Sequence, residues 1–354
     1  MRIFADNERL NYTGRIDWKN PKETVFVFPC TSVQMNFTGN QLHVILENHN
    51  GYWINYMGYI LDGEQKRLLL PNEETVELEI PVKENETNEH SILLFKRQDS
   101  CHEVVFKGFE IGDEEMILPP EEKPARKIEV YGDSVSAGEV SEAVEYVGKA
   151  DPEHNGEFSN SWYSYAWMTA RKLNAQIHDI AQGGIALLDH TGWFFEPNAV
   201  GMESAWDKVH YNPTFGEATN WDFKEYIPQV VIVAIGQNDN HPYDYMKEEY
   251  EGERAKKWRS HYKGFLEKIR RQYPDAYIIC ITTLLEHDSS WDCSIDQVVT
   301  ELGDKKISHY LFKRNGKGTP GHLRIPEAEE MADELAAYIE EKMKTNDMWS
   351  SIDL

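Results

Sequence analysis

The chain has 354 residues, of which 61 are acidic and 36 basic, so its formal net charge is −25 at pH 7. Nucleic-acid binding rests on Lys and Arg that neutralise phosphates, so no nucleic-acid partner is expected. The same charge repels strongly anionic substrates and membrane surfaces. A neutral substrate therefore fits best, although the charge serves solubility equally well.

The beginning of the chain, "MRIFADNERLNYTG", has no apolar core of signal-peptide length, and no run approaches about 18 apolar residues. We therefore expect a cytoplasmic location and no membrane span. The four cysteines, Cys30, Cys101, Cys280 and Cys293, form no CxxC motif, which suits a reducing compartment. Cys280 lies in the apolar run "AYIICITTL" and is expected to be buried.

Residues 1–118 show only strand patterns. Short apolar or alternating runs are bounded by Gly, Asn, Asp or Pro, namely "ETVFVFP", "SVQMNFTG", "QLHVILENH", "YWINYMGYILDG", "TVELEIPV", "HSILLFKRQ" and "HEVVFKGFEIG". Strands at this spacing predict an all-β sandwich or barrel. The Pro-rich, charged residues 119–126 predict a linker.

Residues 127–345 alternate between strand and helix. Strands are predicted at 127–132, 176–181, 229–236, 276–284 and 306–312, and helices at 161–174, within 248–273 and at 325–344. Almost continuously apolar strands between helices predict a flavodoxin-like parallel sheet with helices on both faces. Ligands of such sheets bind beyond the carboxyl ends of the strands.

Chemically active residues follow these strand ends. Ser134 comes just after the first strand, Gly183 and Gly184 after the second, and Asn238 after the third. His322 lies in a Gly-rich loop between the fifth strand and the last helix. A serine nucleophile needs a base and donors for the oxyanion, and these strand ends can supply all of them. Asp133 and Asp239 are expected to be structural.

The order GDS, Gly, GxND and a late His resembles the SGNH or GDSL hydrolase superfamily. The blocks "LNYTGRID", "RKIEVYGDSVSAGE", "SWYSYAWMTARKLNAQIHDIAQGGIAL" and "NWDFKEYIPQVVIVAIGQNDN" resemble carbohydrate esterase family 2 over about residues 10 to 345. The resemblance implies an N-terminal jelly-roll before an SGNH domain. It also implies removal of acetyl groups from plant polysaccharides and their oligosaccharides, without metal or cofactor.

By position in this resemblance, Ser134 is the nucleophile and His322 the general base. The oxyanion hole then comprises the N–H groups of Ser134 and Gly183 and the side chain of Asn238, with Gly184 competing for the role of Gly183. The superfamily's Asp before the histidine is absent, because Thr319 and Pro320 occupy its usual positions. A Ser-His dyad oriented by a backbone carbonyl is therefore expected.

Alternatives remain open around this core. Asp288 or Asp292, in the predicted loop "LLEHDSSWDC", could orient His322 instead. Trp193 and Trp291 each follow a strand end, so each either stacks on a sugar ring or packs in the core. The long aromatic segment 192–223 forms either a wall of the site or a subunit contact, which would make the protein a homo-oligomer.

The sequence thus predicts an acetyl esterase acting on xylo- or manno-oligosaccharides. One alternative is a lysophospholipase or acyl-thioesterase of the same superfamily, which would need an apolar acyl tunnel. Another is a non-catalytic carbohydrate-binding protein. The β domain either binds sugar or packs beside the site and shapes it.

Overall fold

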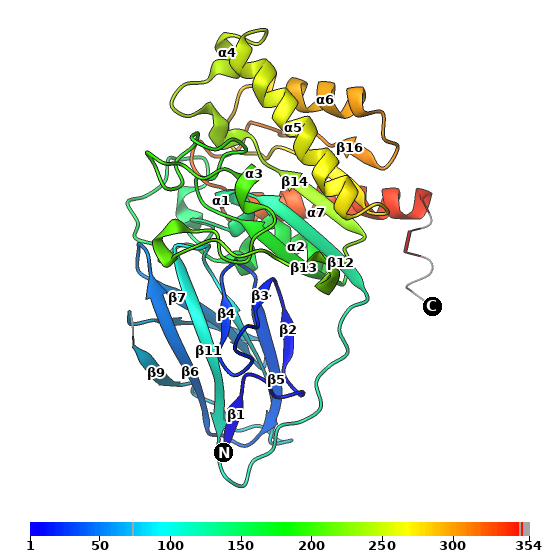
Figure 1. Ribbon diagram of the computed structural model, residues 1–354. Helices are drawn as coiled ribbons and strands as arrows, with labels where there is room; N and C mark the ends of the chain where they lie inside the picture. The colour runs from blue at the N-terminus through cyan, green and yellow to red at the C-terminus, as the bar shows by residue number, and fades with distance from the viewer. Residues whose placement is uncertain (73, 347, 350–354) are drawn as a thin grey trace.

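The computed structural model describes residues 1–72, 74–346 and 348–349. In Figure 1 a β sandwich at the bottom carries the N-terminus, and an α/β part lies above it. A long connection runs outside both parts from the end of β11 at Ile111 to the start of β12 at Arg126. The predicted boundaries at residues 118 and 127 fall in or next to this connection and stay predictions.

The N-terminal part consists of two antiparallel sheets. One has the order β3-β4-β11-β6-β9 with β1 beside β11, and the other the order β2-β5-β10-β7-β8. The first contains β1 (Arg2–Phe4), β3 (Ile16–Asp17), β4 (Thr24–Phe26), β6 (Leu42–Asn50), β9 (Thr75–Glu79) and β11 (His102–Ile111). The second contains β2 (Asn11–Thr13), β5 (Ser32–Thr38), β7 (Tyr56–Leu61), β8 (Glu64–Leu69) and β10 (Glu89–Lys96).

Alternating side chains hold the two sheets together. Val33, Met35 and Phe37 on β5 are buried at every second position, and they share one core with Val44 and Val104 of the other sheet. Burying one face of each sheet in this way is what a sandwich requires. The predicted all-β N-terminal part is confirmed.

The sequence patterns did not predict four of the strands, namely β1, β2, β3 and β8. Strand β8 reads "EQKRLL" and is mostly exposed, so it lacks the apolar alternation on which the prediction relied. It pairs with β7 through a tight turn at Asp62 and Gly63, which both have positive φ. An Asp-Gly pair is a strong hairpin signal, and it is the pattern that could have found β8.

The C-terminal part has a parallel five-stranded sheet in the order β13-β12-β14-β15-β16. The strands are β12 (Arg126–Gly132), β13 (Ala175–Ala181), β14 (Val230–Ala234), β15 (Tyr277–Cys280) and β16 (Ile307–His309). The longer helices are α2 (Tyr165–Lys172), α5 (Glu253–Gln272), α6 (Ser290–Leu302) and α7 (Ile325–Thr345). Short helical turns are α1 (Ser134–Ala137), α3 (Met202–Ala205), α4 (Tyr245–Glu248), η1 (Val144–Tyr146), η2 (Ser161–Tyr163), η3 (Pro213–Phe215), η4 (Phe223–Glu225) and η5 (Gln237–Asn240).

Helices cover both faces of this sheet, as predicted. Val230 and Ile232 of β14 share a core with α2 and α7, whereas Val231 and Val233 share the opposite core with α5 and α6. Successive strand residues point to opposite faces, so every residue of β14 is buried. This explains why the strand reads as a continuous apolar run.

Helix α6 was not predicted. Its sequence "SWDCSIDQVVTEL" contains Ser, Asp, Cys and Val, which are only moderate helix formers. The helix nevertheless buries Trp291, Ile295 and Val298, which are spaced to lie on one helical face. Tertiary packing therefore outweighs local propensity here.

The two parts share a buried interface. Arg15 of the β domain is fully buried, donates to the carbonyl oxygens of Trp206 and Lys208, and lies 3.5 Å from the carboxylate of Glu129 on β12. A buried ion pair of this kind is costly to break, because one charge would be left unpaired. The sandwich is thus fixed against the α/β part.

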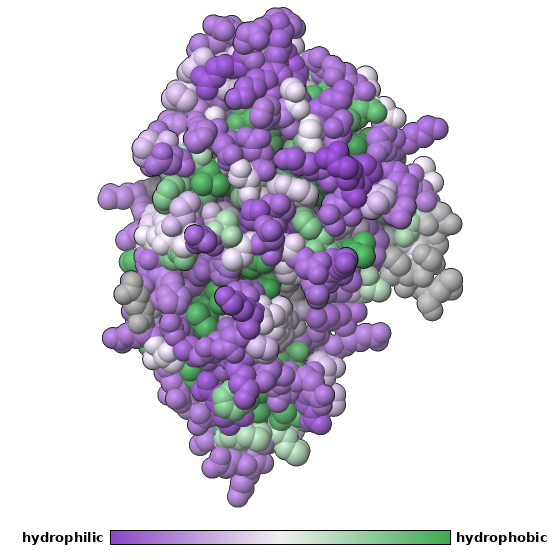
Figure 2. Space-filling model, in the orientation of Figure 1, coloured by the Kyte–Doolittle hydropathy of each residue, from purple (hydrophilic) through white to green (hydrophobic). Residues whose placement is uncertain are grey.

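The outer surface seen in Figure 2 is mostly hydrophilic, with hydrophobic residues in small separate groups. Within the described residues, no helix combines the length and hydropathy needed to cross a bilayer.

Candidate active site

Ser134 lies at the carboxyl end of β12. The strand ends at Gly132, Asp133 caps α1 by accepting a hydrogen bond from the Val135 N–H at 3.0 Å, and Ser134 is the first residue of the helix. A side chain at position 132 would lie 2.0 Å from Ser136 Oγ, so only glycine permits this turn. The serine is therefore held at a fixed place where the strand meets the helix.

His322 is oriented by a carboxylate, which differs from the sequence prediction. Its Nδ1 lies 2.7 Å from Oδ2 of Asp151, and its backbone N–H donates to Oδ1 of the same residue at 2.9 Å. Arg324 adds an ion pair to Asp151 at 2.8 Å. The expected backbone carbonyl is thus replaced by a side-chain carboxylate, and Ser134, His322 and Asp151 have the composition of a triad.

The two alternative aspartates have other partners. Asp292 lies 3.1 Å from Nε2 of His287 and accepts a hydrogen bond from Thr282, and it sits in helix α6 rather than in a loop. Asp288 accepts a hydrogen bond from the Ser290 N–H at 3.0 Å. Neither contacts His322 among the described residues, so this alternative is wrong.

Thr319, at the position where the superfamily usually has the aspartate, connects two segments of the site. Thr319 donates from Oγ1 to Glu327 at 2.7 Å and accepts at the same oxygen from the Gly148 N–H at 2.8 Å. It thereby ties the segment that carries Asp151 to the loop that carries His322. Gly321 completes this approach, because a Cβ there would lie 2.3 Å from Asp151 Oδ1.

His322 and Asp151 each shift the pKa of the other. Burial alone would lower the pKa of His322, but the carboxylates of Glu139 and Asp151 raise it to about 9. Burial alone would raise the pKa of Asp151, but its hydrogen bond to His322 and the charge of Arg324 hold it well below its usual range. The two carboxylates therefore stabilise the imidazolium over the neutral ring, and only the neutral ring, whose population grows as the pH rises towards 9, can accept the serine proton.

The predicted oxyanion donors are partly engaged. Asn238, in η5 after β14, donates from Nδ2 to the Ile185 carbonyl at 3.1 Å and more weakly to Asp133 at 3.4 Å. The Gly183 N–H donates to Oδ2 of Asp99 at 2.6 Å, so it is not free in this structure. The N–H of Gly184 donates to no acceptor within the described residues, which favours the competing candidate.

Asp133 and Asp239 are structural, as expected. Asp133 forms the helix cap described above, and the buried carboxylate of Asp239 accepts hydrogen bonds from the N–H groups of Leu187 and Leu188 at 2.7 and 3.2 Å. Cys280 is fully buried, also as expected.

The two candidate tryptophans, Trp193 and Trp291, lie in different surroundings. Trp193 is 57% exposed and lines the cavity in front of Ser134. Trp291 is buried in the core, where it packs edge-on against Tyr245 and Trp258, so its predicted contact with sugar is wrong. A residue after a strand end can point either way, and the amphipathic pattern of α6 turns this one inward.

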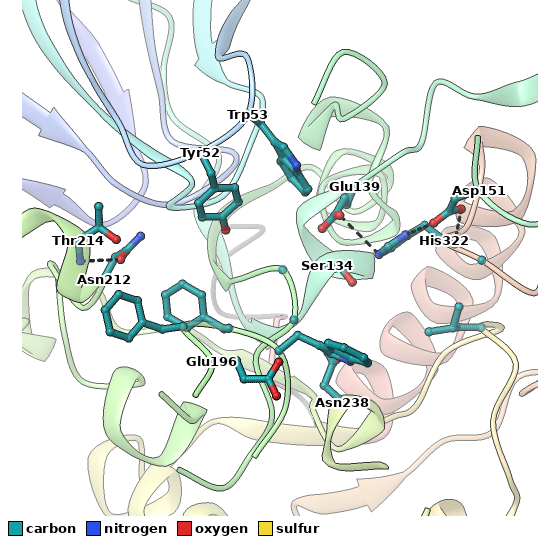
Figure 3. Close-up of a pocket in the computed structure, with 17 residues that line it drawn as sticks. Tyr52, Trp53, Ser134, Glu139, Asp151, Glu196, Asn212, Thr214, Asn238 and His322 are labelled. Carbon is teal, nitrogen blue, oxygen red and sulfur yellow. Dashed lines mark hydrogen bonds and ion pairs between the residues drawn. The ribbon is translucent and has the colours of Figure 1, made fainter. Parts of the chain in front are cut away.

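The cavity holds about 670 Å³ and is formed by both parts of the molecule. Segment 192–223 lines it, which confirms the interpretation of that segment as a wall of the site. Tyr52 and Trp53 enter from the β domain, as Figure 3 shows, and nothing in the sequence indicated them as site residues. The lining residues are Tyr52, Trp53, Ser134, Glu139, Asp151, Gly183, Gly184, Trp193, Phe194, Phe195, Glu196, Asn212, Thr214, Asn238, Leu285, Gly321 and His322.

This combination defines a class of protein. A parallel sheet with a serine after its first strand, an asparagine after its third and a histidine before its last helix is the SGNH hydrolase arrangement. The β sandwich that precedes the α/β part narrows the class to SGNH hydrolases that carry an N-terminal β domain.

Comparisons with known proteins agree with this class. The family model described as "Carbohydrate esterase 2 N-terminal" matches residues 12–120. A curated relative, "Cellulase/esterase CelE" of Acetivibrio thermocellus, is 29% identical over 351 residues, covering 96% of this chain and 40% of the relative. The "Acetylxylan esterase / glucomannan deacetylase" of Cellvibrio japonicus is 27% identical over 245 residues, covering 68% of this chain and 64% of the relative.

A solved structure of a family two carbohydrate esterase from Clostridium thermocellum, in complex with cellohexaose, superposes with a TM-score of 0.79 at 27% identity. The match covers 95% of this chain and 99% of that one. The resemblance inferred from sequence is confirmed: the chain has the N-terminal domain of carbohydrate esterase family 2 and the fold of a solved family 2 enzyme.

Proposed function

We propose that the protein is a serine esterase that removes acetyl groups from plant-derived xylo- or manno-oligosaccharides. The observation that carries this proposal is the hydrogen-bonded pair of His322 and Asp151 beside Ser134 in one cavity. The similarity to an acetylxylan esterase / glucomannan deacetylase supports an acetyl ester on a polysaccharide backbone.

In the proposed reaction, Ser134 Oγ attacks the acetyl carbonyl while His322 Nε2 takes its proton. Backbone N–H groups near Ser134 and the Asn238 amide stabilise the oxyanion. His322 then protonates the departing sugar oxygen, which leaves as a hydroxyl, and a water molecule, activated by the same imidazole, releases acetate and frees Ser134. Asp151 keeps the imidazole in the tautomer with its proton on Nδ1.

The cavity suits a sugar better than a long acyl chain. Its wall combines the exposed ring of Trp193 with Trp53 and the exposed carboxylate of Glu196. Aromatic rings offer apolar faces to sugar rings, while amide and carboxylate groups pair with hydroxyls. The net charge of −25 also suits a neutral oligosaccharide.

NMR of acetylated xylo- and manno-oligosaccharides before and after treatment tests the proposal. The wild-type protein should release acetate, and Ser134→Ala should lower the rate by at least about 10³-fold. Unchanged acetate release by Ser134→Ala would contradict a serine mechanism. Binding without release by the wild type would favour the non-catalytic alternative.

A p-nitrophenyl ester series tests the second alternative. The acetate should be the best substrate, and activity should fall towards the octanoate. Activity that rises with chain length would instead favour a lysophospholipase or thioesterase. Cytoplasmic location and a homo-oligomeric state stay predictions.

A further inference from the structure

Glu139 brings a second carboxyl group to His322. It follows helix α1, its side chain is only 11% exposed, and its Oε1 lies 3.8 Å from His322 Nε2. Figure 3 shows Glu139 and His322 converging above Ser134, with Asp151 on the far side of the imidazole. The imidazole therefore has a carboxyl group at each nitrogen, and Glu139 is on the side where the ester reacts.

The carboxyl group of Glu139 accepts no hydrogen bond from the residues that the structure describes. Burial raises its pKa to about 7, although the charge of His322 opposes that shift. Its Oε2 lies against Gly183, where a Cβ would come within 2.6 Å of it. These oxygens open onto the cavity and receive no donor from the described residues, so a ligand hydroxyl can supply one.

The proposed reaction limits how far such a donor can lie from Glu139. To receive a proton, the leaving oxygen of the ester must come within roughly 3 Å of His322 Nε2. It then lies no more than about 7 Å from Glu139 Oε1, given the 3.8 Å between the carboxyl group and the imidazole. In a partly acetylated sugar, the hydroxyl on the neighbouring ring carbon is the donor closest to that oxygen.

We propose that Glu139 is a specificity-determining residue that accepts a hydrogen bond from the free hydroxyl next to the ester being cleaved. This inference rests on the proposed function. It predicts that the protein prefers an acetyl group whose neighbouring position is unsubstituted, and that it discriminates against a neighbouring position that is acetylated or lacks its hydroxyl.

Glu139 also affects the base itself, and the two effects are separable. The charged groups around the pair come from the β domain, from the start of α1, from the segment between η1 and η2, and from the start of α7, namely Asp99, Asp133, Asp151, His154 and Arg324. Removing the charge of Glu139 lowers the pKa of His322 for every substrate alike. Loss of the hydroxyl contact affects only substrates that carry the hydroxyl.

Measuring the wild type and Glu139→Leu with two substrates isolates the contribution of the contact between Glu139 and the neighbouring hydroxyl. The probes are a methyl β-xyloside with one acetyl ester and the same ester whose neighbouring hydroxyl is replaced by hydrogen. For the wild type, kcat/KM should be about tenfold or more higher for the hydroxyl-bearing ester. In Glu139→Leu the ratio should fall to about 1. The ratio is taken at each pH, so that the ionisation of His322 cancels.

Two further variants control the experiment. Glu139→Gln keeps the size of the side chain and an uncharged acceptor, so its ratio of kcat/KM values should lie between those of the wild type and Glu139→Leu. If Glu139→Leu does not fold, the comparison of Glu139→Gln with the wild type is the test. Glu145→Gln removes the same charge from an exposed position in the same segment and should keep the wild-type ratio.

The outcomes are distinguishable. If the wild type cleaves neither ester, the proposed function fails. If it cleaves both equally well, or if Glu139→Leu keeps the discrimination, the function stands and the role of Glu139 is overturned. A shift of the pH profile alone, with an unchanged ratio, would also overturn it.

Discussion

Nδ1 of His322 and Oδ2 of Asp151 are 2.7 Å apart, although 171 residues separate them along the chain. The carboxylate comes from a segment with no regular secondary structure, which Thr319 holds in place through the Gly148 N–H. The chain thus keeps a carboxylate on its base while a threonine occupies the usual position of that carboxylate.

Replacing Asp151 should disable the base without preventing substrate binding. Asp151→Asn presents an amide that can donate to Nδ1, which leaves the imidazole proton on Nε2, where it cannot accept the serine proton. We expect kcat to fall about 10³-fold with little change in KM. Asp288→Asn is the matched control, since Asp288 only caps the start of α6, and it should keep wild-type kcat. Equal losses in both variants would argue against the role of Asp151.

Asn238 should act mainly in the transition state. Asn238→Ala removes the amide expected to bind the oxyanion, so kcat should fall by about 10² to 10³ while KM changes little. Steady-state kinetics on p-nitrophenyl acetate measure both constants. A higher KM with unchanged kcat would mean that Asn238 contacts only the bound substrate.

The two tryptophans should separate binding from stability. Trp193→Ala should raise KM for oligosaccharides by about tenfold, because an exposed stacking surface is lost, and leave the melting temperature unchanged. Trp291→Ala empties a buried site in the core and should lower the free energy of unfolding by about 3–5 kcal/mol. Urea unfolding and kinetics on both variants check this; a stability loss in Trp193→Ala would contradict the assignment.

His210 should make stability depend on pH. It joins segment 192–223 to the β domain through Asp17 and Glu103, each at 3.0 Å. Burial alone would lower its pKa, but these two carboxylates raise it to about 9. Because the folded pKa exceeds the ordinary value, the stabilisation is complete below about pH 6.5 and disappears as the pH rises through about 9.

His210→Gln should therefore lower the melting temperature strongly at pH 6 and only slightly at pH 9.5. Thermal unfolding of both proteins across this range provides the measurement. A difference in melting temperature that does not vary with pH would show that the ring acts by packing and not by charge.

Local pattern alone was enough for the order of most strands and of helices α2, α5 and α7, for the two fold types, and for the positions of Ser134, Asn238 and His322. Strand residues alternate and helix residues repeat with fixed periods, and parallel sheets gather ligands at one edge, so these features can be read from neighbouring residues. The exposed strand β8 and the helix α6 were missed, because the first lacks the apolar pattern and the second has only moderate helix formers.

Only the tertiary structure decided what surrounds the serine. Asp151, Glu139 and Asp99 reach the site from segments outside the regular strands and helices, and Tyr52 from the start of a predicted strand run; Asp99 and Tyr52 come from the other domain. It also decided that Trp193 lines the cavity while Trp291 is buried. The physical reason is that such contacts depend on chain packing over long sequence separations. Strand ends therefore indicated Ser134 and His322 as candidates, whereas packing determined which carboxylates lie beside His322.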